Sequence, residues 1–193
     1  MKKVCIYSGS FNPIHNGHIA LAESVIQQNL SEEVWVVVSP HNPMKVDSEL
    51  LDDALRLEMA KMAFGENEKI LVSDIEFRLP RPSYTIDTLE FIKYRYKECQ
   101  FSLLIGGDNL QSFSQWRRYK DILLNYEILV YPRGQIEVVV PDELAAGNIK
   151  IIDAPKIDIS STEIRYMILN GVDYSSYLPP SVVDFIMEKG LYC

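Results

Sequence analysis

The chain has 193 residues, of which 47% are hydrophobic, and this length predicts a single domain over residues 1–193. The formal net charge of −8 disfavours nucleic acid as a partner, because phosphate backbones select basic surfaces. No apolar run approaches the roughly 18 residues of a membrane span, so we expect no membrane contacts. Cys5, Cys99 and Cys193 are too widely spaced for a disulfide framework or a zinc ribbon, so we expect a cytoplasmic protein.

Segments typical of strands and of helices alternate along the chain. Continuous apolar runs predict strands that are covered on both faces, at Lys3–Tyr7, Glu33–Ser39, Ile70–Asp74, Phe101–Ile105, Tyr126–Tyr131 and Ile149–Asp153. Helical patterns occur at Gly17–Asn29, Leu50–Phe64, Ser83–Tyr96, Ser160–Asn170 and Ser181–Lys189, and residues 134–148 read as a surface connection. This alternation predicts an α/β fold with a doubly wound, mostly parallel sheet and helices on both faces. Ligands of such sheets bind beyond the carboxyl ends of the strands.

The segment SGSFNPIHNGH at residues 8–18 joins the first strand to the first helix. Backbone N–H groups at a helix N-terminus and the helix dipole both favour an anion. Gly9 and Gly17 let the backbone approach a ligand closely, and His15 and His18 add hydrogen-bond donors. A purely structural role and a metal pair are the alternatives, but no Cys, Asp or Glu nearby completes a ligand set. We therefore predict a phosphate site and no resident metal.

A second helix start lies far downstream, at residues 157–165 with the sequence IDISSTEIR. Ser160 or Ser161 can cap this helix, and Glu163 supplies the reciprocal acid of a capping box. From that pattern alone, a well-capped helix is the simplest interpretation. Arg165 lies one turn into the helix, at the end that carries the free amides, so it can add a guanidinium around an anion.

Two segments before helices or after strands are further candidates. Pro40–Lys45 follows the second strand, and we favour a phosphate contact for Lys45 and a mere turn for His41. Ser83 reads as the N-cap of the third helix, which would leave the amides of Tyr84, Thr85 and Ile86 unpaired.

The fourth and fifth strands also end in residues that suit a nucleotide. Gly106 permits close approach, and Asp108 can accept hydrogen bonds from ribose hydroxyls or simply cap a helix. Trp116 is either a core residue or an aromatic surface on which a planar ring can stack. Arg117 follows it directly, and Arg133 follows the fifth strand.

Residues 8–18 and 157–165 together resemble the two signatures of the HxGH nucleotidyltransferase superfamily, HxGH and ISSTxIR. Pro-Ser-Tyr-Thr at residues 82–85, the Gly-Gly-Asp strand exit and Trp116 resemble its bacterial nicotinate-nucleotide adenylyltransferase branch. The resemblance implies that ATP and nicotinate mononucleotide are joined with release of pyrophosphate in NAD biosynthesis, with Mg²⁺ carried by ATP. The superfamily more usually has Gly, Thr and Asp at the positions of Ser8, Ser10 and Asn12. Asn12 therefore lacks the negative charge that an aspartate would carry there.

The resemblance also implies a role for each matching residue. Catalysis would rest on His15, His18 and Arg165. The ATP site would comprise Ser8, Gly9, Ser10, Phe11, Gly17, Gly106, Asp108, Ser160, Ser161 and Thr162. The substrate side would comprise Lys45, Tyr84, Thr85, Trp116, Arg117 and Arg133.

Three other functions compete with this interpretation. The first is another transfer within the superfamily, such as pantetheine-phosphate adenylyltransferase or a cytidylyl transfer. The second is a domain like those of class I aminoacyl-tRNA synthetases, which the acidic charge and the absence of a KMSKS-like lysine pair disfavour. The third is a non-catalytic nucleotide sensor. The sequence neither requires nor excludes a homo-oligomer.

Overall fold

The computed structural model describes residues 1–40, 50–132, 138–155 and 158–193. Within these ranges, parallel strands form one six-stranded sheet in the order β3-β2-β1-β4-β5-β6. The strands are β1 (Lys2–Gly9), β2 (Glu33–Val38), β3 (Ile70–Ser73), β4 (Cys99–Gly106), β5 (Glu127–Tyr131) and β6 (Ile149–Ile151). The order reverses between β1 and β4, as in doubly wound dinucleotide-binding sheets, and confirms the predicted fold class.

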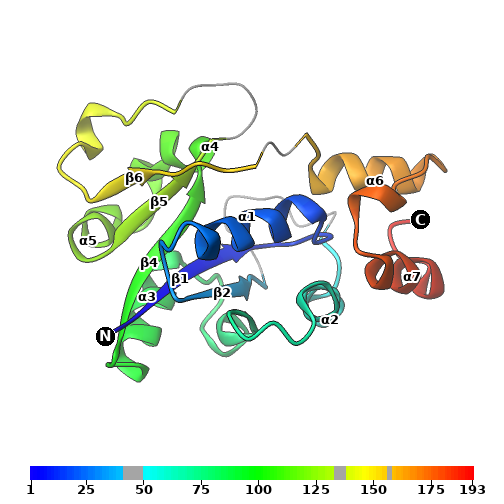
Figure 1. Cartoon of the computed structure of the whole chain (residues 1–193), viewed down its shortest axis with the longest axis horizontal. Helices are drawn as coiled ribbons and strands as arrows, with labels where there is room; N and C mark the ends of the chain where they lie inside the picture. The colour runs from blue at the N-terminus through cyan, green and yellow to red at the C-terminus, as the bar shows by residue number, and fades with distance from the viewer. Residues whose placement is uncertain (41–49, 133–137, 156–157) are drawn as a thin grey trace.

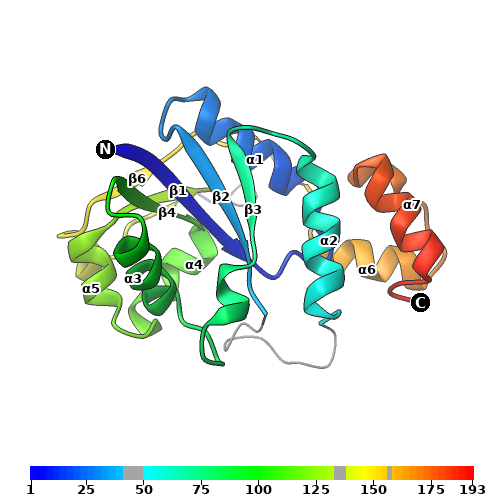
Figure 2. The ribbon, with the colours of Figure 1, turned by 90° about the horizontal axis from the view of Figure 1, so that it is seen from below.

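Helices cover both faces of the sheet (Figures 1 and 2). Successive residues of a strand point to opposite faces, so Cys5 and Tyr7 of β1 join one buried cluster while Val4 and Ile6 join another. The first cluster includes residues of α1, α2, α6 and α7, and the second includes residues of α3, α4 and α5. The helices are α1 (Asn16–Gln27), α2 (Asp53–Phe64), α3 (Thr85–Arg95), α4 (Gly107–Gln111), α5 (Tyr119–Asn125), α6 (Ser161–Leu169) and α7 (Pro180–Lys189).

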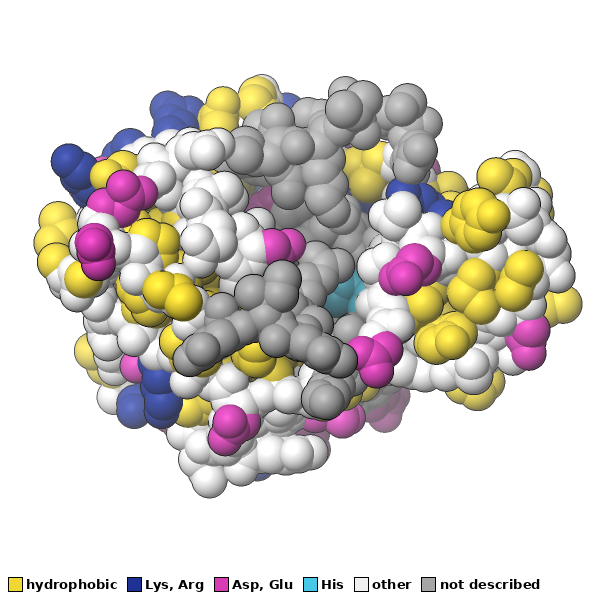
Figure 3. All heavy atoms as spheres, turned by 90° about the horizontal axis from the view of Figure 1, so that it is seen from above, with side chains coloured by type: hydrophobic (Ala, Val, Ile, Leu, Met, Phe, Trp, Pro, Cys, Tyr) yellow, Lys and Arg dark blue, Asp and Glu magenta, His cyan; other side chains and the backbone are white. Residues whose placement is uncertain are grey.

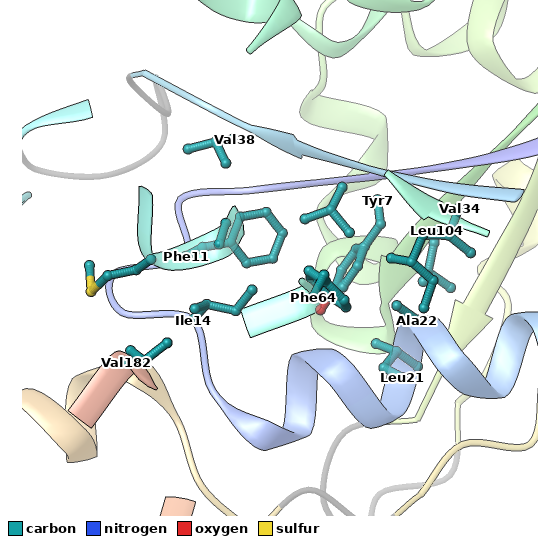
Figure 4. Close-up of a cluster of buried hydrophobic side chains, with 14 of the residues drawn as sticks. Tyr7, Phe11, Ile14, Leu21, Ala22, Val34, Val38, Phe64, Leu104 and Val182 are labelled. Carbon is teal, nitrogen blue, oxygen red and sulfur yellow. The ribbon is translucent and has the colours of Figure 1, made fainter. Parts of the chain in front are cut away.

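Segments far apart in the sequence meet beyond the carboxyl end of β1. Ile14, in the connection from β1 to α1, shares its buried cluster with Tyr7 of β1 and Val182 of α7 (Figure 4). Helix α7 also packs against α2, as Figure 2 shows. The two last helices therefore reach the loop that carries the first sequence motif.

Two helix starts differ from the predicted ones. Tyr84, not Ser83, caps α3, because the Ser83 hydroxyl donates at 3.0 Å to a buried carboxylate, that of Glu76. Asp52 caps α2 by accepting from the backbone N–H of Ala54 at 2.9 Å, so this helix begins after the predicted Leu50.

Other elements were missed because they are short. The helices α4 and α5 lie between β4 and β5 and are too brief for a clear periodicity. The prediction that residues 134–148 are only a surface connection was wrong in part. Leu144 lies in a 3-10 turn, Asp142–Leu144, and is fully buried in the second cluster. Among the described residues, no helix is both long enough and apolar enough to cross a membrane.

Candidate active site

A cavity of about 400 Å³ lies at the carboxyl ends of β1 and β4. Its position is the one expected for a ligand of a doubly wound sheet, next to the point where the strand order reverses. The space-filling view shows this face hollowed, with a histidine side chain visible in the hollow (Figure 3). Eight of the predicted site residues line the cavity wall, namely Ser8, Gly9, Tyr84, Thr85, Gly106, Asp108, Trp116 and Arg117.

The loop between β1 and α1, residues 10–15, is held in an unusual backbone conformation. Phe11 has a positive φ of 44°, and the residue is 3% exposed. The ring packs edge-on against His18, with 5.0 Å between ring centroids. Gly9 fits beneath it, because a Cβ there would lie 3.1 Å from the Phe11 ring. The loop is therefore shaped by packing as well as by the helix start.

His15 and His18 form a stacked pair at the start of α1. His15 is the N-cap residue, and the ring centroids lie 3.6 Å apart. The backbone N–H of His15 donates to Nδ1 of His18 at 3.2 Å. Because Nδ1 accepts this bond, a neutral His18 ring carries its proton on Nε2. The ring therefore presents its donor on the side away from the backbone of the cap.

The second motif contacts the first one directly. Ser160 caps α6 and forms a capping box with Glu163, as predicted. The Ser161 hydroxyl donates to the carbonyl oxygen of Pro13 at 2.8 Å. Arg165 donates through Nη1 to the carbonyl oxygen of Asn12 at 2.9 Å, across 153 positions of sequence. The start of α6 and the start of α1 thus face a common loop.

The predicted site residues form two groups. Among the described residues, the cavity wall does not include the two histidines or the α6 residues, which gather around the β1–α1 loop instead. Lys45 and Arg133 lie outside the described residues, as does His41.

Arg56 is a fully buried side chain that sequence reasoning missed. Its guanidinium donates to the carbonyl oxygens of Ser10, Ser39, Pro40 and Leu51 at 2.5–3.1 Å, and pairs with Asp53 at 2.6 Å. Burial lowers the pKa of Arg56, and the nearby Asp53 opposes that shift. Arg56 therefore joins the β1–α1 loop to the exit of β2. Arg56 lies three and four positions before the buried residues Met59 and Ala60, a spacing that places all three on the same face of α2. This spacing could have identified Arg56 as a buried residue.

Glu76 is the second buried charge that sequence reasoning missed. It is 3% exposed, lies in the 3-10 turn Ile75–Arg78 and lines the cavity. Its carboxylate accepts from the hydroxyls of Ser8 (2.9 Å), Ser83 (3.0 Å) and Thr88 (3.1 Å). It therefore connects the end of β1 to the start of α3. No local pattern marks this residue, because its three donors come from separate segments.

Aromatic and charged side chains gather near the start of α3. The guanidinium of Arg117 lies 4.7 Å from the ring centroid of Tyr84, within the range of a cation–π contact, and pairs with Asp87 at 3.7 Å. Trp116 packs at 5.0 Å against the buried ring of Phe113 and also lines the cavity. Trp116 thus has a core contact on one side and the cavity on the other.

Gly106 is the last residue of β4, and Asp108 lies in α4 rather than capping it. The N-cap of α4 is Gly106. A Cβ on Gly106 would lie 2.4 Å from a carboxylate oxygen of Asp108 and 3.3 Å from the ring of Tyr131. Only glycine leaves room for the carboxylate to turn back beside the strand end, where it lines the cavity.

Comparisons with known proteins agree with this geometry. Residues 6–167 match the family model described as cytidylyltransferase-like, so the chain is a nucleotidyltransferase. A relative from Flavobacterium johnsoniae is 44% identical over 190 residues, which cover 98% of each chain. A relative from Bacteroides fragilis is 42% identical over 187 residues, which cover 97% of this chain and 92% of the relative.

Both relatives carry the name "Probable nicotinate-nucleotide adenylyltransferase". The chain belongs to the nicotinate-nucleotide adenylyltransferase family, and the resemblance inferred from the motifs is confirmed. The nicotinic acid mononucleotide adenylyltransferase of Plasmodium falciparum, solved in complex with NaAD, has the same fold. It has a TM-score of 0.82 and 23% identity, and the alignment covers 100% of this chain and 98% of that one.

Proposed function

We propose that the cavity and the neighbouring β1–α1 loop together form a site that joins nicotinate mononucleotide to the AMP part of ATP, giving nicotinate adenine dinucleotide and pyrophosphate in NAD biosynthesis. The observation that carries this proposal is the meeting of the two anion motifs, through the Arg165 contact to the Asn12 carbonyl oxygen. A triphosphate between these helix starts would meet donors from both sides. The aromatic side chains of Tyr84 and Trp116 in the cavity wall supply a separate place for a planar ring.

The reaction is a single displacement at phosphorus. An oxygen of the substrate's 5′-phosphate attacks the α-phosphorus of ATP, and the bond to the oxygen that bridges the α- and β-phosphates breaks. That oxygen leaves on pyrophosphate. A phosphate monoester is already anionic, so the step requires no general base. Catalysis then consists of positioning and of stabilising the developing charge.

The residues around the β1–α1 loop suit that role. His15 and His18 would donate to the α- and β-phosphates, and the Nε2 proton of His18 follows from its bond to the His15 backbone. Arg165 would bind the leaving pyrophosphate as a planar fork, with help from hydroxyls and amides at the start of α6, namely Ser160, Ser161 and Thr162.

The rest of the ATP site would lie along the strand ends. Gly9 and Gly106 line the cavity and would contact the nucleotide through their backbones, and Asp108 would accept from the ribose hydroxyls. Further nucleotide contacts would come from Ser8, Ser10, Phe11 and Gly17.

The opposite side of the cavity would hold the pyridine ring. Trp116 would lie against the ring face, and the amides near Tyr84 and Thr85 would receive the carboxylate. Arg117 would add positive charge there, since it already lies over Tyr84. Lys45 and Arg133 keep the substrate-binding roles predicted from the sequence.

Magnesium would arrive with ATP rather than reside in the protein. Within the described residues, no group of three His, Cys, Asp or Glu side chains is arranged to hold a metal ion. The Asp108 carboxylate lies in the cavity, whereas the Glu76 oxygens already accept three hydroxyl groups. This donor set fits an ion that keeps mostly water and phosphate ligands. When bound, the ion would neutralise charge on the triphosphate.

Residues 1–193 would act as one domain. Ile164 of α6 and Phe185 of α7 share a buried cluster with Tyr7 of β1, which supports a common core for the first and last elements.

Pyrophosphate release tests the proposal directly. The protein should release pyrophosphate from Mg²⁺-ATP with nicotinate mononucleotide, and far less with phosphopantetheine. Faster release with phosphopantetheine would favour the other transferase of the superfamily. ATP binding without release, for any acceptor, would favour the nucleotide sensor.

A further inference from the structure

The segment after α7 returns to the β1–α1 loop. The Tyr192 hydroxyl donates to Oδ1 of Asn12 at 2.9 Å, across 180 positions of sequence. The same Oδ1 accepts from the backbone N–H of Leu51 at 3.3 Å. The backbone carbonyl oxygen of Asn12 accepts from Arg165. One residue of the loop is thus held by three segments, which lie before α2, within α6 and after α7.

Tyr192 is itself held in place. Its φ of 66° lies in the left-handed region, which a residue with a side chain rarely adopts without support from its surroundings. The preceding Leu191 is buried in the same cluster as Ile14 and Val182. Burial raises the pKa of Tyr192 well above its usual range, although Arg165 and Arg56 act against this shift. The hydroxyl therefore stays protonated and able to donate at ordinary pH.

The side chain at position 12 suits this donor. The amide oxygen of Asn12 is a neutral acceptor, and it takes both the Tyr192 hydroxyl and the Leu51 N–H. The contact orients the residue whose carbonyl oxygen fixes Arg165 and which stands three positions before His15. A shift of Asn12 would therefore move donors of both anion motifs together.

We propose that Tyr192 is a positioning residue for the adenylyl transfer, acting through Asn12 on the phosphate-binding loop. The inference rests on the proposed function, since it assumes that this loop receives the phosphates of ATP. Tyr192 acts on the geometry of His15 and Arg165 and touches neither substrate. Its loss should therefore impair the handling of ATP and leave the pyridine ring largely unaffected.

The test is Tyr192→Phe, which keeps the ring and removes only the hydroxyl. We expect kcat/KM for ATP to fall about tenfold, the scale of one lost hydrogen bond, with a matching rise in the Kd of Mg²⁺-ATP. The KM for nicotinate mononucleotide should change by less than about twofold, and Tm by only about 2 °C. Tyr94→Phe is the matched control, because Tyr94 is 79% exposed on α3.

A double-mutant cycle with Asn12→Ala separates positioning from packing. In the Asn12→Ala background, Tyr192→Phe should have no further effect on kcat/KM for ATP. An unchanged kcat/KM in Tyr192→Phe would overturn the proposal. The proposal would also be overturned if Tyr192→Phe still lowered kcat/KM for ATP tenfold in the Asn12→Ala background. The same holds if Tyr192→Phe lowered kcat/KM equally for both substrates and also lowered Tm.

The failure of the proposed function would look different. Wild-type protein would then release no pyrophosphate from ATP and nicotinate mononucleotide. The Kd of Mg²⁺-ATP for wild type and Tyr192→Phe would still decide the positioning claim, because equal values would refute it and a weaker variant would support it.

Discussion

The two groups of predicted site residues are built in different ways. At the proposed phosphate end, around the β1–α1 loop and the start of α6, several contacts join segments more than 100 positions apart, such as Arg165 with Asn12 and Ser161 with Pro13. At the pyridine end, around the start of α3 and Trp116, the contacts are shorter in sequence. Trp116 packs on Phe113, and Arg117 pairs with Asp87. The first end is fixed by the whole fold, whereas the second is a local surface on one side of a cavity.

From this difference we infer a division of roles between the two groups in the proposed reaction. Stabilising charge in a transition state requires donors in fixed positions, and contacts from several parts of the chain provide them. Binding a flat ring requires an aromatic surface and a few polar groups, which a local cluster of side chains can supply. Changes at the phosphate end should therefore lower kcat or weaken ATP binding, and changes at the pyridine end should raise KM for the pyridine substrate.

The largest expected effect is that of His18→Ala. Removing one preorganised donor at developing charge should lower kcat by about 10²–10³-fold. Steady-state pyrophosphate release measures this loss, and circular dichroism should show an unchanged fold. A folded variant with a kcat near that of wild type would remove His18 from the catalytic machinery.

Arg165→Lys should come next, although it keeps the charge. A lysine lacks the planar fork, so it cannot contact both the Asn12 carbonyl oxygen and phosphate oxygens in the same way. We expect a loss of about 10–100-fold in kcat/KM for ATP, the scale of a charged hydrogen bond. Arg95→Lys, on the exposed side of α3, is the matched control. Equal kinetics in the two variants would leave Arg165 without a role in ATP binding.

Trp116→Ala probes the pyridine end. Losing an aromatic face should raise KM for nicotinate mononucleotide by about tenfold, with kcat changed far less. Trp35→Phe serves as the control, since Trp35 packs against Tyr96 and Phe101 away from the cavity. A loss confined to kcat in Trp116→Ala would contradict the division of roles.

Glu76→Gln should have the smallest kinetic effect. Glu76 connects the end of β1 to the segment before α3 through Ser8 and Ser83, and it is not one of the residues proposed to bind either substrate. An amide nitrogen cannot accept a hydroxyl proton, so at least one of the three hydroxyls loses its acceptor. We expect the free energy of unfolding to fall by about 1–2 kcal/mol in urea titrations, with only a few-fold change in either KM. Glu188→Gln, exposed on α7, should leave the unfolding free energy unchanged.

The sequence predicted the strand and helix contexts of the two motifs better than the buried residues that hold those motifs in place. The two motifs and their strand and helix contexts follow from local patterns, and the capping box at Ser160 is an example. The buried partners Arg56 and Glu76 do not, because their contacts come from segments that only the fold brings together. The cap of α3 was misplaced for the same reason, since Ser83 donates to Glu76 instead.

The most direct test of the account is the ratio of kcat/KM for nicotinate and nicotinamide mononucleotides. A carboxylate can accept from the amides at the start of α3, whereas a carboxamide would turn an NH₂ toward those donors and leave a buried polar group unmatched. Such a group costs about 1–3 kcal/mol, so the account predicts a preference of about 10–150-fold for the acid. Equal values, or a preference for the amide, would contradict it.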